Sequence, residues 1–199
     1  MPLGIELIHR SGGEIAAYLD DLARLRIEVF REFPYLYDGS PAYEAKYLQT
    51  YLDSPDSIAM LALDGARVIG ASTGLPLADE TEAFQRPFVA RGYAVERVFY
   101  CGESVLHRDY RGRGIYRHFF QGREDHARRL ARFDYCSFCG VQRPGHHPLR
   151  PAGYQPLDAI WTRFGYTRHP ELTTTFSWKD IDEATESDKP MLFWMKALA

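Results

Sequence analysis

The chain has 199 residues, of which 45% are hydrophobic and 26% are charged. These proportions are typical of a folded globular protein and argue against a disordered, collagen-like or membrane-embedded chain. The formal net charge of -3 argues against a general binder of nucleic acids or acidic membranes, because such proteins usually carry a basic surplus. The length is that of one domain, which we expect to span residues 1–199.

Two features bear on where the protein resides. No uncharged apolar run approaches the ~20 residues that span a bilayer, and residues 1–14 lack the apolar stretch of a signal peptide. The three cysteines, an odd and sparse set, suit a reducing compartment better than a disulfide framework. We therefore expect a cytoplasmic protein that does not bind a membrane.

The first half of the chain predicts a strand, two helices and a hairpin. A capping box, Ser11 with Glu14, starts the first helix, whose apolar face keeps helical spacing until Pro34 stops it. Pro41 opens the second helix, and Asp64-Gly65 suits a tight hairpin turn. In chain order, we expect a strand at 5–8, helices at 12–33 and 41–52, and antiparallel strands at 58–63 and 68–75.

The second half predicts four more strands and two clear helices. Residues 78–92 are ambiguous and suggest a helix broken by Pro87, whereas residues 142–156 are dense in proline and glycine and predict a long loop. Strands are expected at 98–106, 135–141, 172–178 and 191–196, and helices at 114–132 and 157–164. This order predicts a mixed α/β (α+β) domain whose largely antiparallel sheet is covered by helices.

Positive charge is concentrated between His107 and Arg132. This segment holds eight arginines and three acidic residues, a net charge of +5 in an otherwise acidic chain. Within it, Arg111-Gly112-Arg113-Gly114 lies between a predicted strand and a predicted helix, where closely spaced glycines let N–H groups surround phosphate oxygens and the helix dipole adds to the attraction. The segment lacks the Lys-Ser/Thr of a P-loop and a G-x-G-x-x-G. We expect a pyrophosphate to bind there.

The stretch Leu106-His107-Arg108-Asp109-Tyr110-Arg111-Gly112-Arg113-Gly114-Ile115 resembles the acyl-CoA-binding segment of the GNAT superfamily of N-acyltransferases, which runs strand, Arg/Gln-x-x-Gly-x-Gly/Ala, helix. The order of elements is also similar over nearly the whole chain. The resemblance implies a GNAT-like sheet in which two neighbouring parallel strands splay apart. It further implies direct transfer of an acetyl or other short acyl group from acetyl-CoA or acyl-CoA to a small-molecule or peptide amine, without a metal, and it is compatible with a homodimer.

The resemblance also assigns donor-binding residues. It implies that the main chain around Ser104, Val105 and Leu106 pairs with the pantetheine arm of CoA. The amides implied to hold the pyrophosphate are those of Arg111, Gly112, Arg113, Gly114, Ile115 and Tyr116.

The chain departs from the GNAT pattern at two positions. Tyr116 stands where the family usually has Gly or Ala, and Trp161 stands where it often has a general-acid Tyr. A proton donor for the leaving thiolate must then be another group, such as Tyr154, Tyr166 or a loop histidine, or be absent.

Glu103 is the candidate general base. It lies on the predicted central strand, close to where the resemblance puts the donor thioester, and a carboxylate there could take a proton from the acceptor ammonium directly or through water. Glu96 is a second choice. The alternative is structural, because a carboxylate on a strand can simply pair with one of the many arginines.

Tyrosines and histidines in two loops are candidates for the acceptor pocket. Tyr35 and Tyr37, in the loop 34–40, would supply flat apolar surface with a hydroxyl tip. His147, with its neighbour His146, lies in the long loop that borders the predicted site and could contact substrate or shuttle a proton, although solvated loop histidines are common. The tyrosines that recur every four residues are better explained as a helix face packed on the core: Tyr43, Tyr47 and Tyr51.

Cys136-x-x-Cys139 followed by His146-His147 raises the question of zinc. Residues three apart on a strand point to opposite faces, so both thiols cannot easily face one ion. We therefore expect these cysteines to pack in the core, with no metal.

Two other functions fit the pattern less well. Trp161 in place of a tyrosine would suit a CoA-binding sensor or partner module that has lost catalysis. An acyl-homoserine-lactone synthase shares the GNAT fold but uses acyl carrier protein and S-adenosylmethionine, and the well-formed CoA turn speaks against it. The identity of the acceptor and the length of the acyl chain stay open at the level of sequence.

Overall fold

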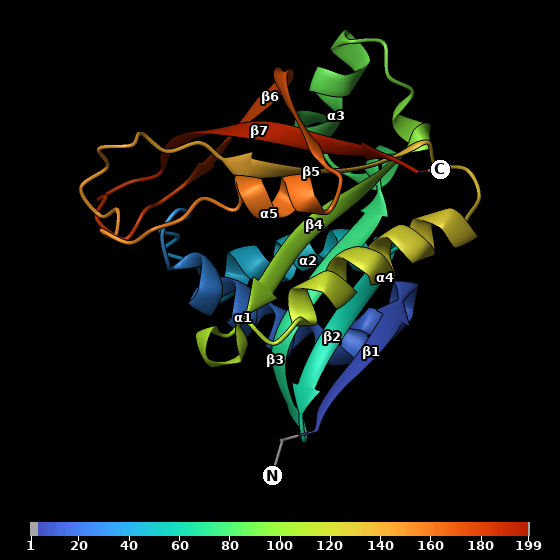
Figure 1. The fold of residues 1–199 in the computed structure, drawn as a ribbon, viewed down its shortest axis with the longest axis horizontal. Coiled ribbons are helices and arrows are strands. Elements are labelled where there is room, and N and C mark those ends of the chain that lie inside the picture. Colours follow the sequence, from blue (N-terminus) through green and yellow to red (C-terminus); the bar gives the residue numbers. More distant parts are fainter. Residues whose placement is uncertain (1–3, 199) are drawn as a thin grey trace.

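The computed structural model describes residues 4–198, whose strands form one sheet in the order β1-β2-β3-β4-β5-β7-β6 (Figure 1). The strands are β1 (Ile5–Ser11), β2 (Ile58–Asp64), β3 (Arg67–Pro76), β4 (Val98–Leu106), β5 (Tyr135–Val141), β6 (Thr167–Trp178) and β7 (Ser187–Ala197). Neighbours pair antiparallel except β4 and β5, which are parallel. The predicted mixed, largely antiparallel sheet is confirmed.

The parallel pair β4 and β5 splays apart, as the resemblance to GNAT proteins implied. The two strands pair only from Val98 with Tyr135 to Tyr100 with Ser137. Beyond that point they run in different directions (Figure 1), while β4 stays paired with β3 as far as Leu106 with Gly70. The edge of β4 that faces β5 therefore has no strand partner from Cys101 onward, and a wedge-shaped gap opens between the two strands.

Helices cover both faces of the sheet. α4 (Ile115–Arg129) crosses one face over β2, β3 and β4, and α1 (Leu19–Phe30) with α2 (Pro41–Asp53) covers the opposite face (Figure 1). α3 (Glu82–Ala90) packs on β6, and α5 (Asp158–Arg163) lies beside the gap near β5. None of the helices formed by residues 4–198 is long and apolar enough to cross a membrane.

The first helix is shorter than predicted at its C-terminal end. Ser11 and Glu14 form the expected capping box, but it starts a 3₁₀ turn over Gly12–Tyr18, and α1 then ends at Phe30. The main-chain N–H groups of Tyr35 and Tyr37 donate to the carbonyls of Glu32 and Phe30, so a reversal of the chain replaces the last helical turn. Phe33 is consequently in a turn and not on the buried helix face.

The prediction that Pro87 breaks the helix in residues 78–92 is wrong. α3 runs through Pro87, which cannot donate to the carbonyl of Ala83 one turn earlier. Thr174 on β6 donates its hydroxyl to that carbonyl at 2.8 Å. The neighbouring strand thus satisfies the group that the proline leaves unpaired, and the helix persists.

The C-terminal hairpin is longer than predicted. β6 begins at Thr167 and β7 at Ser187, five and four residues before the predicted starts. The added parts of both strands are mostly exposed, and a register shift lies between His169 and Thr173, so neither shows the apolar alternation of a half-buried strand.

Cys136 and Cys139 point to opposite faces of β5, as predicted. Cys136 packs with Cys101 and Phe99 on the α4 side, whereas Cys139 lies 3.2 Å from the hydroxyl of Tyr100 on the other side. In the part of the chain that the structure describes, no group of three or more His, Cys, Asp or Glu residues is arranged to hold a metal ion.

Candidate active site

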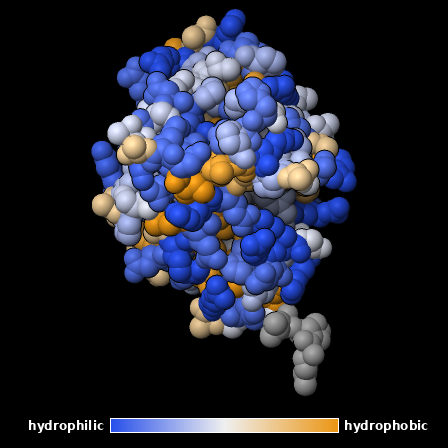
Figure 2. Space-filling view, turned by 90° about the vertical axis from the view of Figure 1, so that its left-hand side faces the viewer, coloured by the Kyte–Doolittle hydropathy of each residue, from blue (hydrophilic) through white to orange (hydrophobic). Residues whose placement is uncertain are grey.

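A cleft of about 1630 Å³ opens at the end of β4, along the edge that β5 leaves unpaired. Its walls come from the C-terminal end of α1, the loop after it, the end of β4, the turn before α4, and α5. Figure 2 views the molecule from the left of Figure 1 and shows apolar surface beside a hollow near the middle of an otherwise hydrophilic face. The cleft is the larger of the two principal cavities.

The turn before α4 is built to bind an anion. Gly112 and Gly114 have φ angles of 78° and 83°, a region that favours glycine, and a Cβ at either position would have no atom within 4 Å. Gly114 is the N-cap of the 15-residue helix α4 and supplies no side-chain acceptor. The N–H groups of Ile115 and Tyr116, in the first turn, have no acceptor within the helix. They are free to bind a phosphate, and the helix dipole favours its negative charge.

The structure brings most of the predicted donor-binding residues to this cleft. The predicted residues that line it are Ser104, Leu106, Arg111, Gly112, Gly114, Ile115 and Tyr116. Arg113 does not line it, because its guanidinium turns back to the carbonyl of Asp109 at 2.9 Å and lies over Tyr110. Only the main chain of Arg113 faces the turn.

Val105 is also misplaced as a pantetheine contact. The amide of His107 donates to Ile69 on β3 at 2.9 Å, and successive residues of an extended chain direct their main-chain groups to opposite sides. Val105 therefore faces β3, and its side chain is fully buried. The main-chain groups of Ser104 and Leu106 face the open edge, where an extended ligand can pair with them.

Three arginines of the cleft lie in or next to the glycine turn, and they differ in how firmly they are held. Arg111 pairs with Glu32 at the end of α1 at 2.8 Å, and its Nε donates to the Leu106 carbonyl at 3.1 Å, which fastens the turn to β4. Arg108 and Arg117 also line the cleft, and no carboxylate between residues 4 and 198 pairs with them. Their charge remains available to phosphate groups.

A second cavity of about 500 Å³ adjoins the first. The residues that line both are Phe30, Phe33, Pro34, Tyr35, Ser104, Tyr116, Phe120, Tyr154 and Leu157. Glu103 lines only the smaller cavity, whereas the glycine turn lines only the larger one. The two cavities therefore share a wall, with the anion-binding turn on one side and a buried carboxylate on the other.

Glu103 is almost fully buried and has one oxygen without a partner. Its Oε2 accepts from Arg26 Nη1 at 2.6 Å and from the Tyr47 hydroxyl at 3.3 Å. Its Oε1 is buried and has no hydrogen-bond partner among the described residues. Arg123 on α4 donates to the Glu103 carbonyl at 3.1 Å and holds the main chain. The expected pairing with an arginine is confirmed, yet it uses only one of the two carboxylate oxygens.

A second and a third acidic residue lie close to this pair. Arg26 also pairs with Glu44 on α2 at 2.5 Å, and the Glu44 side chain is fully buried. Glu80, at the end of the 3₁₀ turn after β3, is 5% exposed. Burial, together with the nearby carboxylate of Glu103, raises the pKa of Glu80 to about 7. Glu44, Glu80 and Glu103 thus form a buried acidic group around Arg26, beside the smaller cavity.

The other candidate base, Glu96, is not near the site. It lies in an exposed 3₁₀ turn before β4, at the end where β4 and β5 are still paired, and it lines neither cavity.

Of the three residues predicted to bind the acceptor, one lines the cavities and two do not. Tyr35 lines both cavities, and burial raises the pKa of its phenol. Tyr37 lines neither, because its ring is buried beside Tyr43. His147 lines neither, since its ring packs on Phe33 at 5.8 Å and its Nδ1 accepts from the amide of Leu149 at 3.2 Å. Tyr37 and His147 support the loops and do not face the cavities.

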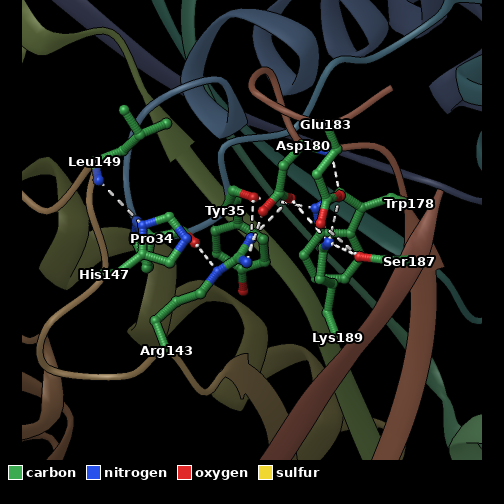
Figure 3. A network of polar contacts seen from close by, with 10 residues as sticks. All are labelled: Pro34, Tyr35, Arg143, His147, Leu149, Trp178, Asp180, Glu183, Ser187 and Lys189. Atoms are coloured by element: carbon green, nitrogen blue, oxygen red, sulfur yellow. Dashed lines mark hydrogen bonds and ion pairs between the residues drawn. The ribbon is translucent and has the colours of Figure 1, made fainter. Parts of the chain in front are cut away.

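Figure 3 shows how the loop after α1 is held against the rest of the site. Arg143, just after β5, donates to the carbonyls of Pro34 and Tyr35 at 2.7 Å each and pairs with the buried Asp180 at 2.7 Å. Lys189 on β7 approaches the same carboxylate at 3.5 Å. Loops distant in sequence are thereby joined behind the aromatic wall of the cavities.

Of the two tyrosines suggested as proton donors, only one lines the cavities. Tyr166 lines neither cavity and is 1% exposed, whereas Tyr154 lines both. Tyr116 lines both as well, and its oxygen accepts from the indole N–H of Trp161 at 3.4 Å. An indole N–H can only donate, so the proton of Tyr116 is left for another acceptor. Burial raises the pKa of Tyr116 and of Tyr154.

Sequence reasoning missed several residues that build the site. Phe30, Phe33 and Phe120 line both cavities, and Arg26 with Tyr47 holds Glu103. Arg26 carried a recognisable signal, because it lies on the apolar face of the first helix, four residues after Leu22. Tyr43, Tyr47 and Tyr51 were predicted to pack on the core. Tyr51 is fully buried as predicted, but Tyr43 is 49% exposed, and Tyr47 also binds Glu103.

Comparison with solved structures identifies the fold. Arabidopsis thaliana NAA60, solved with acetyl-CoA and with a bisubstrate analogue, matches with a TM-score of 0.63 at 13% identity, over 97% of this chain and 99% of that chain. The chain has the GNAT fold. A GNAT-family acetyltransferase from Streptococcus pneumoniae matches with a TM-score of 0.59 at 11% identity, over 98% of this chain and 100% of that chain.

A third GNAT-like structure has a more specific name. Ribosomal-protein-alanine N-acetyltransferase from Brucella melitensis matches with a TM-score of 0.61 at 14% identity, over 97% of this chain and 99% of that chain. No protein-family model matches the sequence, and no curated protein is significantly similar to it. The similarity to GNAT proteins therefore lies in the fold, and chemistry must be argued from the site.

Proposed function

We propose that this protein is an N-acyltransferase that moves an acetyl or other short acyl group directly from acyl-CoA to an amine. The observation that carries the proposal is the shared wall of the two cavities. An anion-binding turn lines the larger cavity, and a buried carboxylate with a free oxygen lines the smaller one. GNAT-fold neighbours that bind acetyl-CoA or are named acetyltransferases support it.

The larger cavity is proposed to hold the donor. The N–H groups at the start of α4 bind the pyrophosphate, with Arg108 and Arg117 adding charge. The open edge of β4 at Ser104 and Leu106 pairs with the pantetheine arm. This arrangement directs the thioester toward the wall that the cavities share.

The smaller cavity is proposed to hold the amine. Glu103 takes a proton from the acceptor ammonium at its unpartnered Oε1, directly or through a water molecule. The free amine then forms a bond to the thioester carbon while the carbon–sulfur bond breaks and sulfur leaves with the electron pair. The positively charged nitrogen gives up its extra proton as the amide forms, which balances the proton that the sulfur takes up. Tyr116 and Tyr154 line both cavities, and either phenol is proposed to protonate that sulfur.

Turnover separates this proposal from the alternative of a CoA-binding module without catalysis. Purified protein is incubated with acetyl-CoA and single amines from a mixed library, and release of free CoA thiol is measured. An N-acyltransferase shows amine-dependent thiol release and an acetylated product by mass spectrometry. Binding of CoA without turnover on any amine would favour the module instead.

A further inference from the structure

The walls of the smaller cavity are chiefly aromatic. Phe30, Phe33 and Tyr35 come from α1 and the loop after it, and Phe138 and Trp161 come from β5 and α5. Phe138 and Trp161 pack edge to face with ring centroids 5.0 Å apart, and the polar network of Figure 3 holds the loop that carries Phe33 and Tyr35. Such a wall favours a flat or large apolar group.

The smaller cavity is lined by charged groups of both signs, and some of them are already hydrogen-bonded within the protein. Glu103 offers one buried oxygen without a partner, which suits an ammonium group. Four arginines line the same cavity: Arg123, Arg143, Arg150 and Arg168. Arg123 is used by the carbonyls of Glu103 and Thr73, and Arg143 by two carbonyls and Asp180. Arg143 therefore has all three of its nitrogens in use, whereas Arg123 uses only Nη1 and its buried Nε has no partner.

Arg150 and Arg168 are not committed in this way. Between residues 4 and 198, neither is paired with an Asp or Glu side chain, and Arg168 donates only to the amide oxygen of Gln142. The guanidinium of Arg150 lies 5.1 Å from the ring centroid of Tyr154 and 5.9 Å from that of Phe33, two residues that line both cavities. One exposed carboxylate, Asp158, lines the cavity too, so a positive surplus remains.

We infer that the acceptor is a primary amine that also carries a carboxylate and an aromatic or large apolar body, as aromatic amino acids do. The amine meets Oε1 of Glu103, the body packs on the aromatic walls, and the carboxylate pairs with Arg150, with Arg168 nearby. This inference rests on the proposed function. It favours a free amino acid over a peptide N-terminus, because in a peptide the same carboxylate is an uncharged amide.

The test compares three compounds that differ only in that group: L-phenylalanine, L-phenylalaninamide and phenethylamine, repeated with the tryptophan series. We expect kcat/KM for the amino acid to exceed that for its amide and its decarboxylated amine by roughly 10- to 100-fold, the usual range for a charge-assisted hydrogen bond. In Arg150→Gln the ratio of kcat/KM between the amino acid and the two compounds without a carboxylate falls toward unity, chiefly through a higher KM for the amino acid. Arg150→Lys restores part of the preference, because it keeps the charge without the fork.

Arg86→Gln is the matched control, since Arg86 is exposed on α3 and lines neither cavity. Equal rates with all three compounds, or an equal loss with all three in Arg150→Gln, would overturn the inference. Acetylation of other amines with no activity on either aromatic series would overturn it as well and leave the acyltransferase assignment intact. Failure of the proposed function itself has a different signature, because no amine would then release CoA thiol.

Discussion

The two carboxylate oxygens of Glu103 differ in their surroundings, and we assign them different roles: one holds the side chain in place and the other accepts the proton. Oε2 is bound to Arg26 and Tyr47, and Oε1 is left without a partner beside the smaller cavity. Several buried polar atoms among the described residues lack a partner, but of the carboxylates among them only Glu103 lines a cavity, where a substrate or water can bind it.

Glu103→Gln should reduce the rate at neutral pH ~10²–10⁴-fold, because the amide keeps the shape but cannot accept the proton. The acidic limb of the pH–rate profile should disappear, and CoA affinity should barely change. Glu44→Gln is the matched control: it also removes a carboxylate from Arg26, but Glu44 lines neither cavity. If the two variants behave alike, or if Glu103→Gln keeps the acidic limb, Glu103 is a structural residue and not the base.

Gly114→Val should abolish CoA binding. The side chain would enter the space through which a phosphate approaches, and the φ of 83° adds strain of ~1–2 kcal/mol for a residue with a Cβ. Gly65→Val tests the strain alone, because Gly65 also has a positive φ of 60° and open space around it but lies in the hairpin turn between β2 and β3. CoA titrations by calorimetry should show loss of binding only at position 114, and retained affinity there would mean that the phosphates bind elsewhere.

Glu80 makes stability depend on pH. Burial raises its pKa to about 7 in the folded state, so the folded protein holds this proton more tightly than the unfolded chain. The resulting stability is fully present below pH ~4.5 and is lost as the pH rises to about 7, by on the order of 3 kcal/mol. Glu80→Gln should therefore gain stability relative to wild type between pH 5 and pH 8 in urea titrations. An unchanged difference across that range would contradict this account.

Among the elements, the loop after α1 depends most on long-range polar contacts. Arg143 and Asp180, both largely buried at the side chain, join it to the ends of β5 and β6. Asp180→Asn should lower the free energy of unfolding by ~3–5 kcal/mol, the usual result of breaking a buried ion pair, and should raise KM for the acceptor more than that for acetyl-CoA. Asp38→Asn is the control, since its pairs with Lys179 and Arg31 are exposed and should contribute little to stability. Equal losses would show that the burial of Arg143 and Asp180 has no special effect.

Elements with a local signal were predictable, and those that depend on a distant partner were not. The hairpin at Gly65 and the strand, turn and helix around Gly114 follow from nearby residues, and the structure has them at nearly the predicted positions. α3 continues through Pro87 only because Thr174, 91 residues away, supplies a donor. Likewise, Tyr37 forms an isolated β-bridge with Asp180, and no local sequence pattern predicts this long-range pairing.

At the scale of the whole molecule, ligand binding and folding are linked. A ligand that binds only the folded state stabilises it by RT ln(1 + [L]/Kd), which is ~2.7 kcal/mol at a hundredfold excess over Kd. CoA or acetyl-CoA at millimolar concentration should therefore raise the Tm in a thermal melt followed by circular dichroism. Dephospho-CoA and pantetheine are graded controls that remove first one phosphate and then all of them. No rise in Tm with CoA would remove the donor assignment.

The GNAT fold and the donor cleft were largely predictable from the sequence, whereas the acceptor cavity was only partly so. The proposed donor site uses main-chain groups between Ser104 and Tyr116, and the glycine spacing indicates their geometry directly. The proposed acceptor cavity uses residues from six segments, and a residue such as His147 can lie in the right loop and still face away from it. One-dimensional spacing does not encode which way such a side chain turns.

The hydrogen bonds that hold the loop after α1 affect how this protein could change during evolution. Its hydrogen bonds link residues 108, 109 and 143 positions apart, so a mutation in any of several distant segments can reshape the acceptor wall. The phosphate turn is local and leaves the far side of the molecule untouched. Under the proposed function, mutations in these loops can therefore change the acceptor while the turn that binds the donor keeps its geometry.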